Sequence, residues 1–196
     1  DALLTLAFQT LAADYPPATA AAACRELALG SGAEGMVGGQ VEDLACESEA
    51  GLRHDPLFPR SSQPRTLEAL EHIHRQKTGA LFLASLRLGL LAAQGERPAG
   101  PDPALQARLD TFGRCFGLAF QVTDDLLDVE GDAQTTGKRV GKDAARGKLT
   151  YPGLLGIEES RRRAARLHEE ARAAVDGLSG AEPLAALMQF VLERRH

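Results

Sequence analysis

Aromatic residues are scarce in this chain. It has no tryptophan, two tyrosines and seven phenylalanines among its 196 residues. Alanine and leucine are abundant instead, which favours helices over strands. The three cysteines, Cys24, Cys46 and Cys115, show no metal-binding spacing such as CxxC. An odd number without a disulfide framework fits a reducing compartment, so we expect buried thiols and a cytoplasmic location.

The sequence also lacks a hydrophobic run long enough to span a membrane. Its most apolar stretch, Thr78 to Leu86, is bounded by Lys77 and Arg87 and is far too short. The first residues lack the basic start of a signal peptide. They also lack a Met and begin as if already inside an amphipathic helix, which we interpret as the loss of an N-terminal part.

The overall composition is that of a soluble globular protein, with 44% hydrophobic and 25% charged residues. A chain of 196 residues fits one domain with a substantial core. The net charge of -5 argues against nonspecific binding to nucleic acid or to an anionic membrane.

Helical periodicity predicts an all-α domain without strands. Thr66 is expected to cap a long helix, Gly30 to end the second helix and Ser31 to cap the third. Loops are expected at 50–65, which holds three prolines, and at 95–103. The predicted helices cover about 1–14, 18–29, 31–49, 66–94, 104–130, 152–176 and 182–194.

Residues 120 to 132 read FQVTDDLLDVEGD and place five carboxylates in an otherwise apolar segment. On a helix, Gln121, Asp124, Asp125 and Asp128 fall within one sector about 100° wide. Two carboxylates ~6 Å apart repel by roughly 3 kcal/mol at an effective dielectric of ~20, so a cation is expected there. Ligands that are all oxygen favour Mg²⁺, with Mn²⁺ as the alternative.

Two simpler interpretations of the acidic segment compete with a metal site. An exposed helix face usually mixes both signs of charge, but this stripe has no Lys or Arg. An EF-hand calcium loop starting at Asp128 fails because Ala133 stands where its turn glycine belongs. Arg139 likewise stands where its bidentate glutamate belongs.

A basic, glycine-rich segment follows, GKRVGKDAARGK at 137–148. Its glycines let the backbone approach a ligand closely, and its lysines can neutralise phosphate oxygens. Magnesium-binding carboxylates beside such a loop are the arrangement that a diphosphate requires. Two further polar pairs fit this interpretation, although each alone is more often structural: Lys77 with Thr78, and Gln40 with Asp43.

Together these motifs resemble those of the trans-isoprenyl (polyprenyl) diphosphate synthases, especially the bacterial farnesyl and geranylgeranyl diphosphate synthases. The resemblance implies a single all-helical domain over 1–196, an isoprenoid-synthase-type bundle around a central cavity, and a homodimer. The matching segments follow the family's order along nearly the whole chain: GMVGGQVEDL, LEHIHRQKTGAL, GLAFQVTDDLLDVEGD, TTGKRVGKD and GKLTYPGLLG.

The resemblance also implies the reaction, a prenyltransferase condensation. An allylic diphosphate ionises with the help of Mg²⁺ and adds to isopentenyl diphosphate, giving farnesyl or geranylgeranyl diphosphate. By this resemblance the metal ligands are Asp124, Asp125 and Asp128, and the diphosphate-binding residues are Lys77, Thr78 and Lys138, with Lys148 nearby. The other matched positions lie along the substrate: Phe120 and Gln121 beside the reacting carbons, Gln40 and Asp43 in the allylic pocket. Catalysis would involve Lys77, Thr78, Gln121 and Lys138.

One departure from the family pattern is a missing motif. The family carries a first aspartate-rich motif and the basic residues for isopentenyl diphosphate upstream, and neither is among these 196 residues. We therefore expect the C-terminal portion of a synthase. The alternative is a truncated or non-catalytic regulatory subunit. Product chain length cannot be read from this sequence.

Overall fold

A computed structural model describes residues 2–48, 65–136 and 148–194, and every regular element in these ranges is helical. The predicted all-α class is therefore confirmed. The elements in chain order are α1 (Ala2–Asp14), α2 (Pro17–Ser31), α3 (Met36–Ser48), α4 (Leu67–His74), the π-helix η1 (Arg75–Gly79), α5 (Ala80–Gln94), α6 (Pro103–Thr136), α8 (Tyr151–Leu155), α9 (Ile157–Val175) and α10 (Glu182–Glu193).

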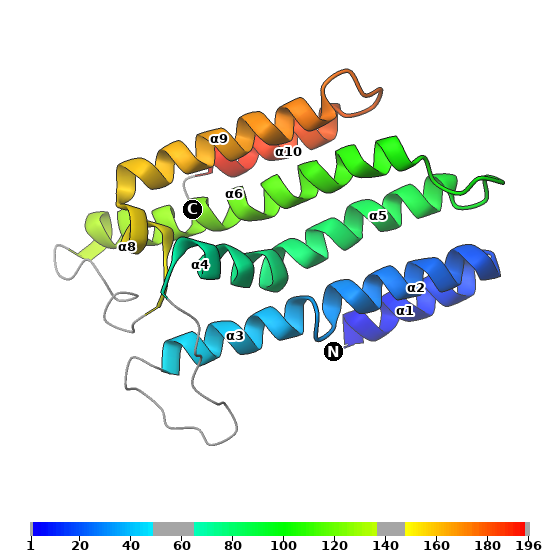
Figure 1. Cartoon of the computed structure of the whole chain (residues 1–196), viewed down its shortest axis with the longest axis horizontal. Helices are drawn as coiled ribbons and strands as arrows, with labels where there is room; N and C mark the ends of the chain where they lie inside the picture. The colour runs from blue at the N-terminus through cyan, green and yellow to red at the C-terminus, as the bar shows by residue number, and fades with distance from the viewer. Residues whose placement is uncertain (1, 49–64, 137–147, 195–196) are drawn as a thin grey trace.

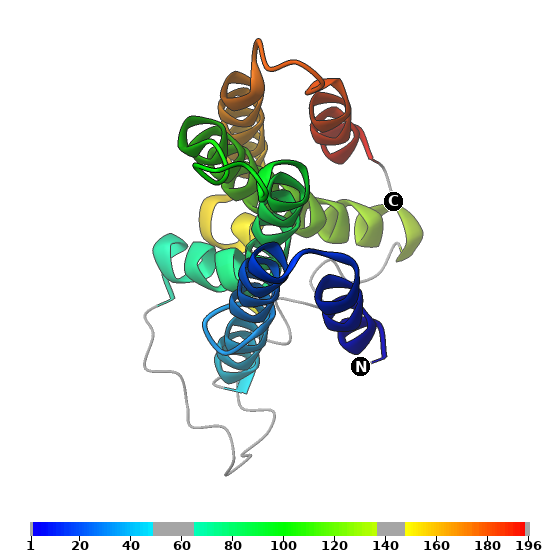
Figure 2. The same ribbon diagram turned by 90° about the vertical axis from the view of Figure 1, so that its right-hand side faces the viewer.

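The long helices lie side by side in a stacked bundle (Figure 1). The α9–α10 pair forms one outer layer and the α1–α2 pair the other, with α6 and α5 between them. The end-on view shows the same order (Figure 2). The longest helix, α6, packs most extensively on α9 and also contacts α5, η1, α8 and α10. It therefore carries the centre of the fold.

The apolar face of α9 explains the tightest of these contacts. Ala164, Leu167, Ala171 and Val175 recur at helical spacing and are all buried. They join a cluster supplied mainly by α6, with further side chains from α8 and α10. Burying a side chain such as Leu167 contributes about 2 kcal/mol from removal of apolar surface from water.

Several predicted helix ends are confirmed, and two assignments are wrong. Gly30 does not end the second helix, since α2 continues through it to Ser31 and has Gly32 as its C-cap. The Thr66 hydroxyl accepts a hydrogen bond from the Ala69 amide at 3.2 Å and caps α4 as predicted. Ser31 does not cap α3. It is the last residue of α2, and its hydroxyl donates to the Leu27 carbonyl at 2.7 Å. A serine side chain can bond back into its own helix as well as cap the next one. A short turn at residues 32–35 then separates α2 from α3.

Three further differences concern the long helices. The helix predicted over 66–94 forms without a break, but its residues 75–79 adopt the wider π-helical turn η1, which the sequence pattern does not predict. The central helix continues to Thr136, because Gly131 costs a propagating helix only about 1 kcal/mol. The helix predicted over 152–176 is broken at Gly156, whose φ of 79° ends α8 before α9 begins.

Other expectations have separate outcomes. The predicted 50–65 loop and most of the basic loop lie outside the described residues. None of the three cysteines forms a disulfide, and Cys46 and Cys115 are buried while Cys24 is partly exposed. In the described part of the chain, no helix combines the length and the apolar content needed to cross a bilayer.

Candidate active site

Two helices approach closely because Gly39 of α3 has no side chain. A Cβ at Gly39 would lie 2.2 Å from the Lys77 backbone nitrogen and 2.8 Å from the Gln76 Cβ. No ordinary side chain fits this gap, so the glycine lets α3 lie directly against η1. In Figure 1, α3 runs below the junction of α4 and α5, where η1 lies.

This contact aligns Lys77 with Asp43. The Lys77 Nζ donates to the Asp43 Oδ2 at 2.5 Å, and the Asp43 side chain is only 13% exposed. Gln40 lies one helical turn before Asp43 on the same helix and is half-buried. The carboxylate thus holds the ammonium group of a lysine whose side chain is still one-third exposed.

A second glycine contact joins η1 to α6. A Cβ at Gly117 would lie 2.8 Å from the Gly79 Cα, so the two backbones cross almost in contact. The Thr78 hydroxyl consequently donates to the Gln121 Oε1 at 2.5 Å. Three sequence-predicted residue pairs, from α3, η1 and α6, are thereby brought into one region.

Aromatic side chains cover the inner side of this region. Phe82 of α5 meets Phe116 edge-to-face with ring centroids 4.7 Å apart and lies 5.6 Å from Phe120. Phe116 is 3% exposed. The wall next to Gln121 is therefore apolar and tightly packed, as an environment that excludes water requires.

Asp124 already binds a cationic side chain. Its Oδ1 accepts from Arg194 at 2.6 Å, and the same guanidinium nitrogen donates to the Phe120 carbonyl at 3.0 Å. The Arg194 Cζ lies 4.1 Å from the centroid of the Phe120 ring. The Asp124 side chain is 49% exposed. Its carboxylate thus faces a position that suits a positive charge.

Asp125 has a different environment from its neighbour. The residue is 3% exposed, and its Oδ2 accepts from the Tyr151 backbone amide at 2.9 Å. Burial raises the pKa of Asp125 to about 7, while the Tyr151 amide and the charge of Lys148 act in the opposite direction. Asp125 therefore lies within the packing between α6 and α8.

The remaining predicted residues have varied positions. Asp128 is exposed one turn beyond Asp124, and Lys148 lies partly buried three residues before the start of α8. Lys138 lies outside the described residues. Among the described residues, no three His, Cys, Asp or Glu side chains are arranged to hold a metal ion. Asp124 and Asp128 nevertheless offer the exposed carboxylate oxygens that Mg²⁺ prefers.

Sequence reasoning missed three residues of this region. Arg194 and Tyr151 contact the aspartates from distant parts of the chain, and no local pattern points to either. His74 is 4% exposed and packs at an angle on Tyr151, with ring centroids 5.6 Å apart. The pKa of His74 is lowered to about 4, mainly by burial; the charge of Asp43 acts in the opposite direction, and the charges of Lys148 and Lys77 add to the lowering.

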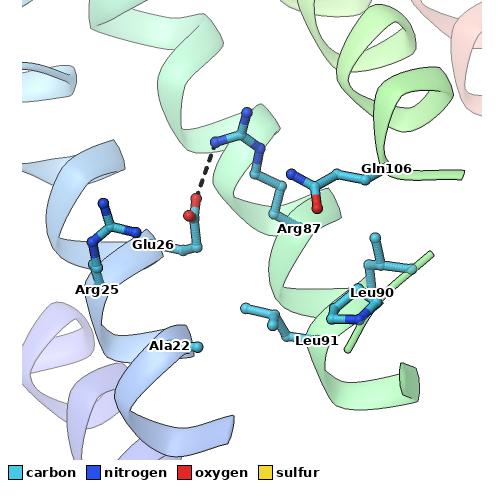
Figure 3. A pocket seen from close by; sticks show the side chains of 8 residues that line it. Ala22, Arg25, Glu26, Arg87, Leu90, Leu91 and Gln106 are labelled. Carbon is cyan, nitrogen blue, oxygen red and sulfur yellow. Dashed lines mark hydrogen bonds and ion pairs between the residues drawn. The ribbon is translucent and has the colours of Figure 1, made fainter. Parts of the chain in front are cut away.

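A surface cavity at another place in the fold contains none of these residues. It lies between α2, α5 and the start of α6, where Arg87 bonds to Glu26 at 3.1 Å (Figure 3). Its lining consists of Ala22, Arg25, Glu26, Arg87, Leu90, Leu91, Pro101 and Gln106. Arg87 is already bound by Glu26 and Asp110, so its charge is not available to a ligand in this cavity.

The polyprenyl synthetase family matches this chain over residues 1–178, which include the aspartate motif and the lysine of η1. The chain belongs to the polyprenyl synthetase family. The farnesyl diphosphate synthase of Escherichia coli strain K12 is 43% identical over 202 aligned residues. That alignment covers 99% of this chain and 61% of the relative, so the chain spans less than two thirds of that length.

Solved structures of polyprenyl synthetases agree with the fold. An FPP/GFPP synthase from Zymomonas mobilis superposes with a TM-score of 0.75 at 32% identity, covering 97% of this chain and 58% of that one. A Helicobacter pylori geranyltransferase complexed with magnesium and isoprenyl diphosphate gives 0.69 at 31% identity, covering 98% and 57%. The bundle is therefore the all-helical fold of these synthases.

Proposed function

We propose that this chain forms the diphosphate-binding portion of a prenyltransferase that condenses an allylic diphosphate with isopentenyl diphosphate to give farnesyl or geranylgeranyl diphosphate. One observation carries the proposal. Side chains from α3, η1 and α6 converge in one region: Asp43, Lys77, Thr78, Gln121 and Asp124. The chain that carries them belongs to a family in which a named relative is a farnesyl diphosphate synthase.

Lys77 and Thr78 are proposed to bind the allylic diphosphate. The Lys77 ammonium is anchored by Asp43 yet partly exposed, so it can donate to a phosphate oxygen while its position is fixed. Thr78 is held by Gln121, which keeps that hydroxyl beside the reacting end of the substrate. Lys148, together with Lys138 from outside the described residues, is proposed to neutralise the remaining phosphate charge.

Asp124 and Asp128 are proposed to hold Mg²⁺, with Mn²⁺ as a substitute. Their all-oxygen donors fit such a hard ion, and the Arg194 guanidinium on Asp124 marks a position suited to positive charge. When bound, the ion would stabilise the negative charge that develops on the leaving diphosphate. The role of Asp125, predicted above as a third ligand, is treated separately below.

Phe120, with Phe82 and Phe116 behind it, is proposed to protect the reacting carbons from water. The rings pack closely and leave an apolar surface next to Gln121. A carbocation that forms at the allylic carbon would otherwise be trapped by water. It would instead add to the double bond of isopentenyl diphosphate, and loss of a proton would complete the product.

The test is the incorporation of radiolabelled isopentenyl diphosphate by the full-length protein. Asp124→Ala should lower turnover by about a hundredfold or more, since it removes a metal ligand from the leaving-group site. Asp14→Ala, at an exposed aspartate of α1, is the matched control and should have no effect. Unchanged turnover in Asp124→Ala would rule out the metal role. A full-length protein without any turnover would favour the regulatory-subunit alternative.

A homodimer and a cytoplasmic location are also proposed. The dimer is supported by α1, which has no buried residue and exposes Leu3, Leu4 and Leu6. Exposed apolar residues gathered on one helix are typical of an interface. The location is supported by three cysteines without a disulfide. Light scattering of the full-length protein should give twice the monomer mass.

A further inference from the structure

Asp125 is separated in environment from the other two aspartates of its motif. Asp128 is exposed and Asp124 is about half exposed, whereas Asp125 is 3% exposed. One oxygen of Asp125 is bound by the Tyr151 amide at 2.9 Å. A metal ligand needs an oxygen directed at an open position, whereas the Asp125 side chain is buried and its Oδ2 is already bound at the α6–α8 contact.

The bond from Tyr151 completes the first turn of α8. A helix leaves its first amides without internal partners. Thr150 caps α8 by accepting from the Gly153 amide at 3.2 Å, and Pro152 has no N–H to satisfy. Neither Thr150 nor a residue of α8 accepts a hydrogen bond from the Tyr151 amide. That amide donates instead to Asp125 of α6.

Tyr151 is well placed to transmit this anchoring. It is fully buried and packs against His74, so the start of α8 is fixed against both α6 and α4. Lys148 lies three residues before Tyr151 and is close enough for its charge to affect both Asp125 and His74. Where α8 begins therefore determines where Lys148 stands relative to Asp124.

We infer that Asp125 is a positioning residue that holds the start of α8, and with it Lys148, beside the aspartate stripe instead of binding the metal ion. The inference rests on the proposed function only in assigning the metal to Asp124. It divides the aspartate motif into an exposed ligand-bearing part and one buried structural acceptor.

Asparagine separates the two roles of this residue. Asp125→Asn keeps a side-chain oxygen that can accept from the Tyr151 amide, but it is a weaker ligand for a divalent cation than a carboxylate because it carries no charge. Asp125→Ala removes the acceptor altogether. Asp124→Asn is the matched control, because it makes the same chemical change at the neighbouring, exposed carboxylate.

The experiment titrates Mn²⁺ into the full-length protein with inorganic pyrophosphate, followed by electron paramagnetic resonance. Asp125→Asn should keep the Kd within about twofold of wild type, whereas Asp124→Asn should raise it about tenfold or more. Hydrogen exchange of the Tyr151 amide gives an independent readout. Exchange should stay slow in Asp125→Asn and become at least about tenfold faster in Asp125→Ala.

The outcomes are distinguishable. If Asp125→Asn weakens Mn²⁺ binding as much as Asp124→Asn, Asp125 is a ligand and the inference is overturned. If Asp125→Ala leaves the exchange of Tyr151 slow, the positioning role is overturned. If instead Asp124→Asn binds Mn²⁺ as well as wild type, the proposed metal site fails, while the exchange result still decides the role of Asp125. An Asp125→Ala variant that does not fold leaves the decision to Asp125→Asn.

Discussion

Arg194 and Asp124 are separated by 70 residues in sequence, yet they form a direct ionic contact at the candidate site. The guanidinium also lies over the Phe120 ring and donates to the Phe120 carbonyl. This position gives the aspartate a counter-ion within the chain itself. A cation that binds Asp124 at the same oxygen must displace it.

Removing the guanidinium should therefore strengthen metal binding. Arg194→Gln is expected to lower the Kd for Mn²⁺ with inorganic pyrophosphate about two- to fivefold, the range for a partly exposed ion pair. The measurement is the same paramagnetic titration. Arg162→Gln, which breaks an exposed pair with Glu159 on α9, should change nothing. A Kd for Arg194→Gln that equals or exceeds the wild-type value would contradict the competition.

Two buried groups near Tyr151 should respond to pH in opposite directions. The pKa of His74 is about 4 in the fold and 6.5 in the unfolded chain, so acidification below pH 6.5 favours unfolding. The pKa of Asp125 is about 7 in the fold and 3.8 when unfolded, so acidification below pH 7 favours folding. In the wild type the two effects offset each other.

Single substitutions should expose each effect. Between pH 7 and pH 5, the free energy of unfolding of His74→Gln should rise by about 1–2 kcal/mol relative to wild type, and that of Asp125→Asn should fall by about as much. Urea unfolding in metal-free buffer measures both slopes. Parallel pH profiles for the three proteins would show that these groups do not titrate as described.

The site depends on the close approach of helices rather than on any one side chain. Gly39 places α3 against η1, and Gly117 places α6 against Gly79. These contacts bring Lys77 within reach of Asp43. The π-helix widens the chain locally between α4 and α5 where Lys77 and Thr78 stand, as π-bulges often do at functional sites.

A methyl group at Gly39 should disturb this arrangement. Gly39→Ala is expected to lower the free energy of unfolding by about 1–3 kcal/mol, because its Cβ meets backbone that cannot move freely. The KM for the allylic diphosphate should rise with it as Lys77 shifts. Gly89→Ala is the matched control in α5, where nothing lies within 4 Å. It should raise stability by up to about 1 kcal/mol, and the reverse order would refute the steric argument.

The molecule separates a binding region from a structural clamp. At the clamp, Arg87 of α5 donates to both oxygens of Asp110 at 2.8 Å and to Glu26 at 3.1 Å, so it joins α2, α5 and α6. The Arg87 side chain is 28% exposed. This clamp contains none of the residues proposed to bind substrate or metal.

Loss of the clamp should affect stability without affecting binding. Arg87→Met is expected to lower the free energy of unfolding by about 2–3 kcal/mol, since it leaves two carboxylates without their partner. Its Kd for Mn²⁺ with pyrophosphate should equal that of wild type. Lys77→Met should show the opposite pattern, with weak pyrophosphate binding and a small stability change. Denaturant titration and the Mn²⁺ titration together check both, and a weakened Kd in Arg87→Met would show that the regions are coupled.

Much of the fold could be predicted because its signals are local. Helical periodicity, the Thr66 cap and the prolines at the start of α2 act within a few residues, so the class and most boundaries follow from the sequence. Ser31 was assigned wrongly for the same reason. A serine can cap one helix or bond within the preceding one, and only the packing chooses between them.

The chemistry of the site was partly predictable as well. Crowded aspartates and the lysine of η1 predict a divalent ion and a diphosphate from their charges, and for this chain that stays a prediction. Helical spacing placed Asp125 in the same sector as Asp124. It could not show that α8 covers one and leaves the other exposed.

The sequence by itself determined an all-helical chain of the polyprenyl synthetase family, with the carboxylates and lysines that are proposed to bind a metal ion and a diphosphate. Only the tertiary structure decided that Arg194 pairs with Asp124 and that the Tyr151 amide donates a hydrogen bond to Asp125. It also decided that the close contact at Gly39 brings Lys77 to Asp43. The physical reason is range: helix formation depends on neighbours within about four residues, whereas these contacts depend on how finished helices pack.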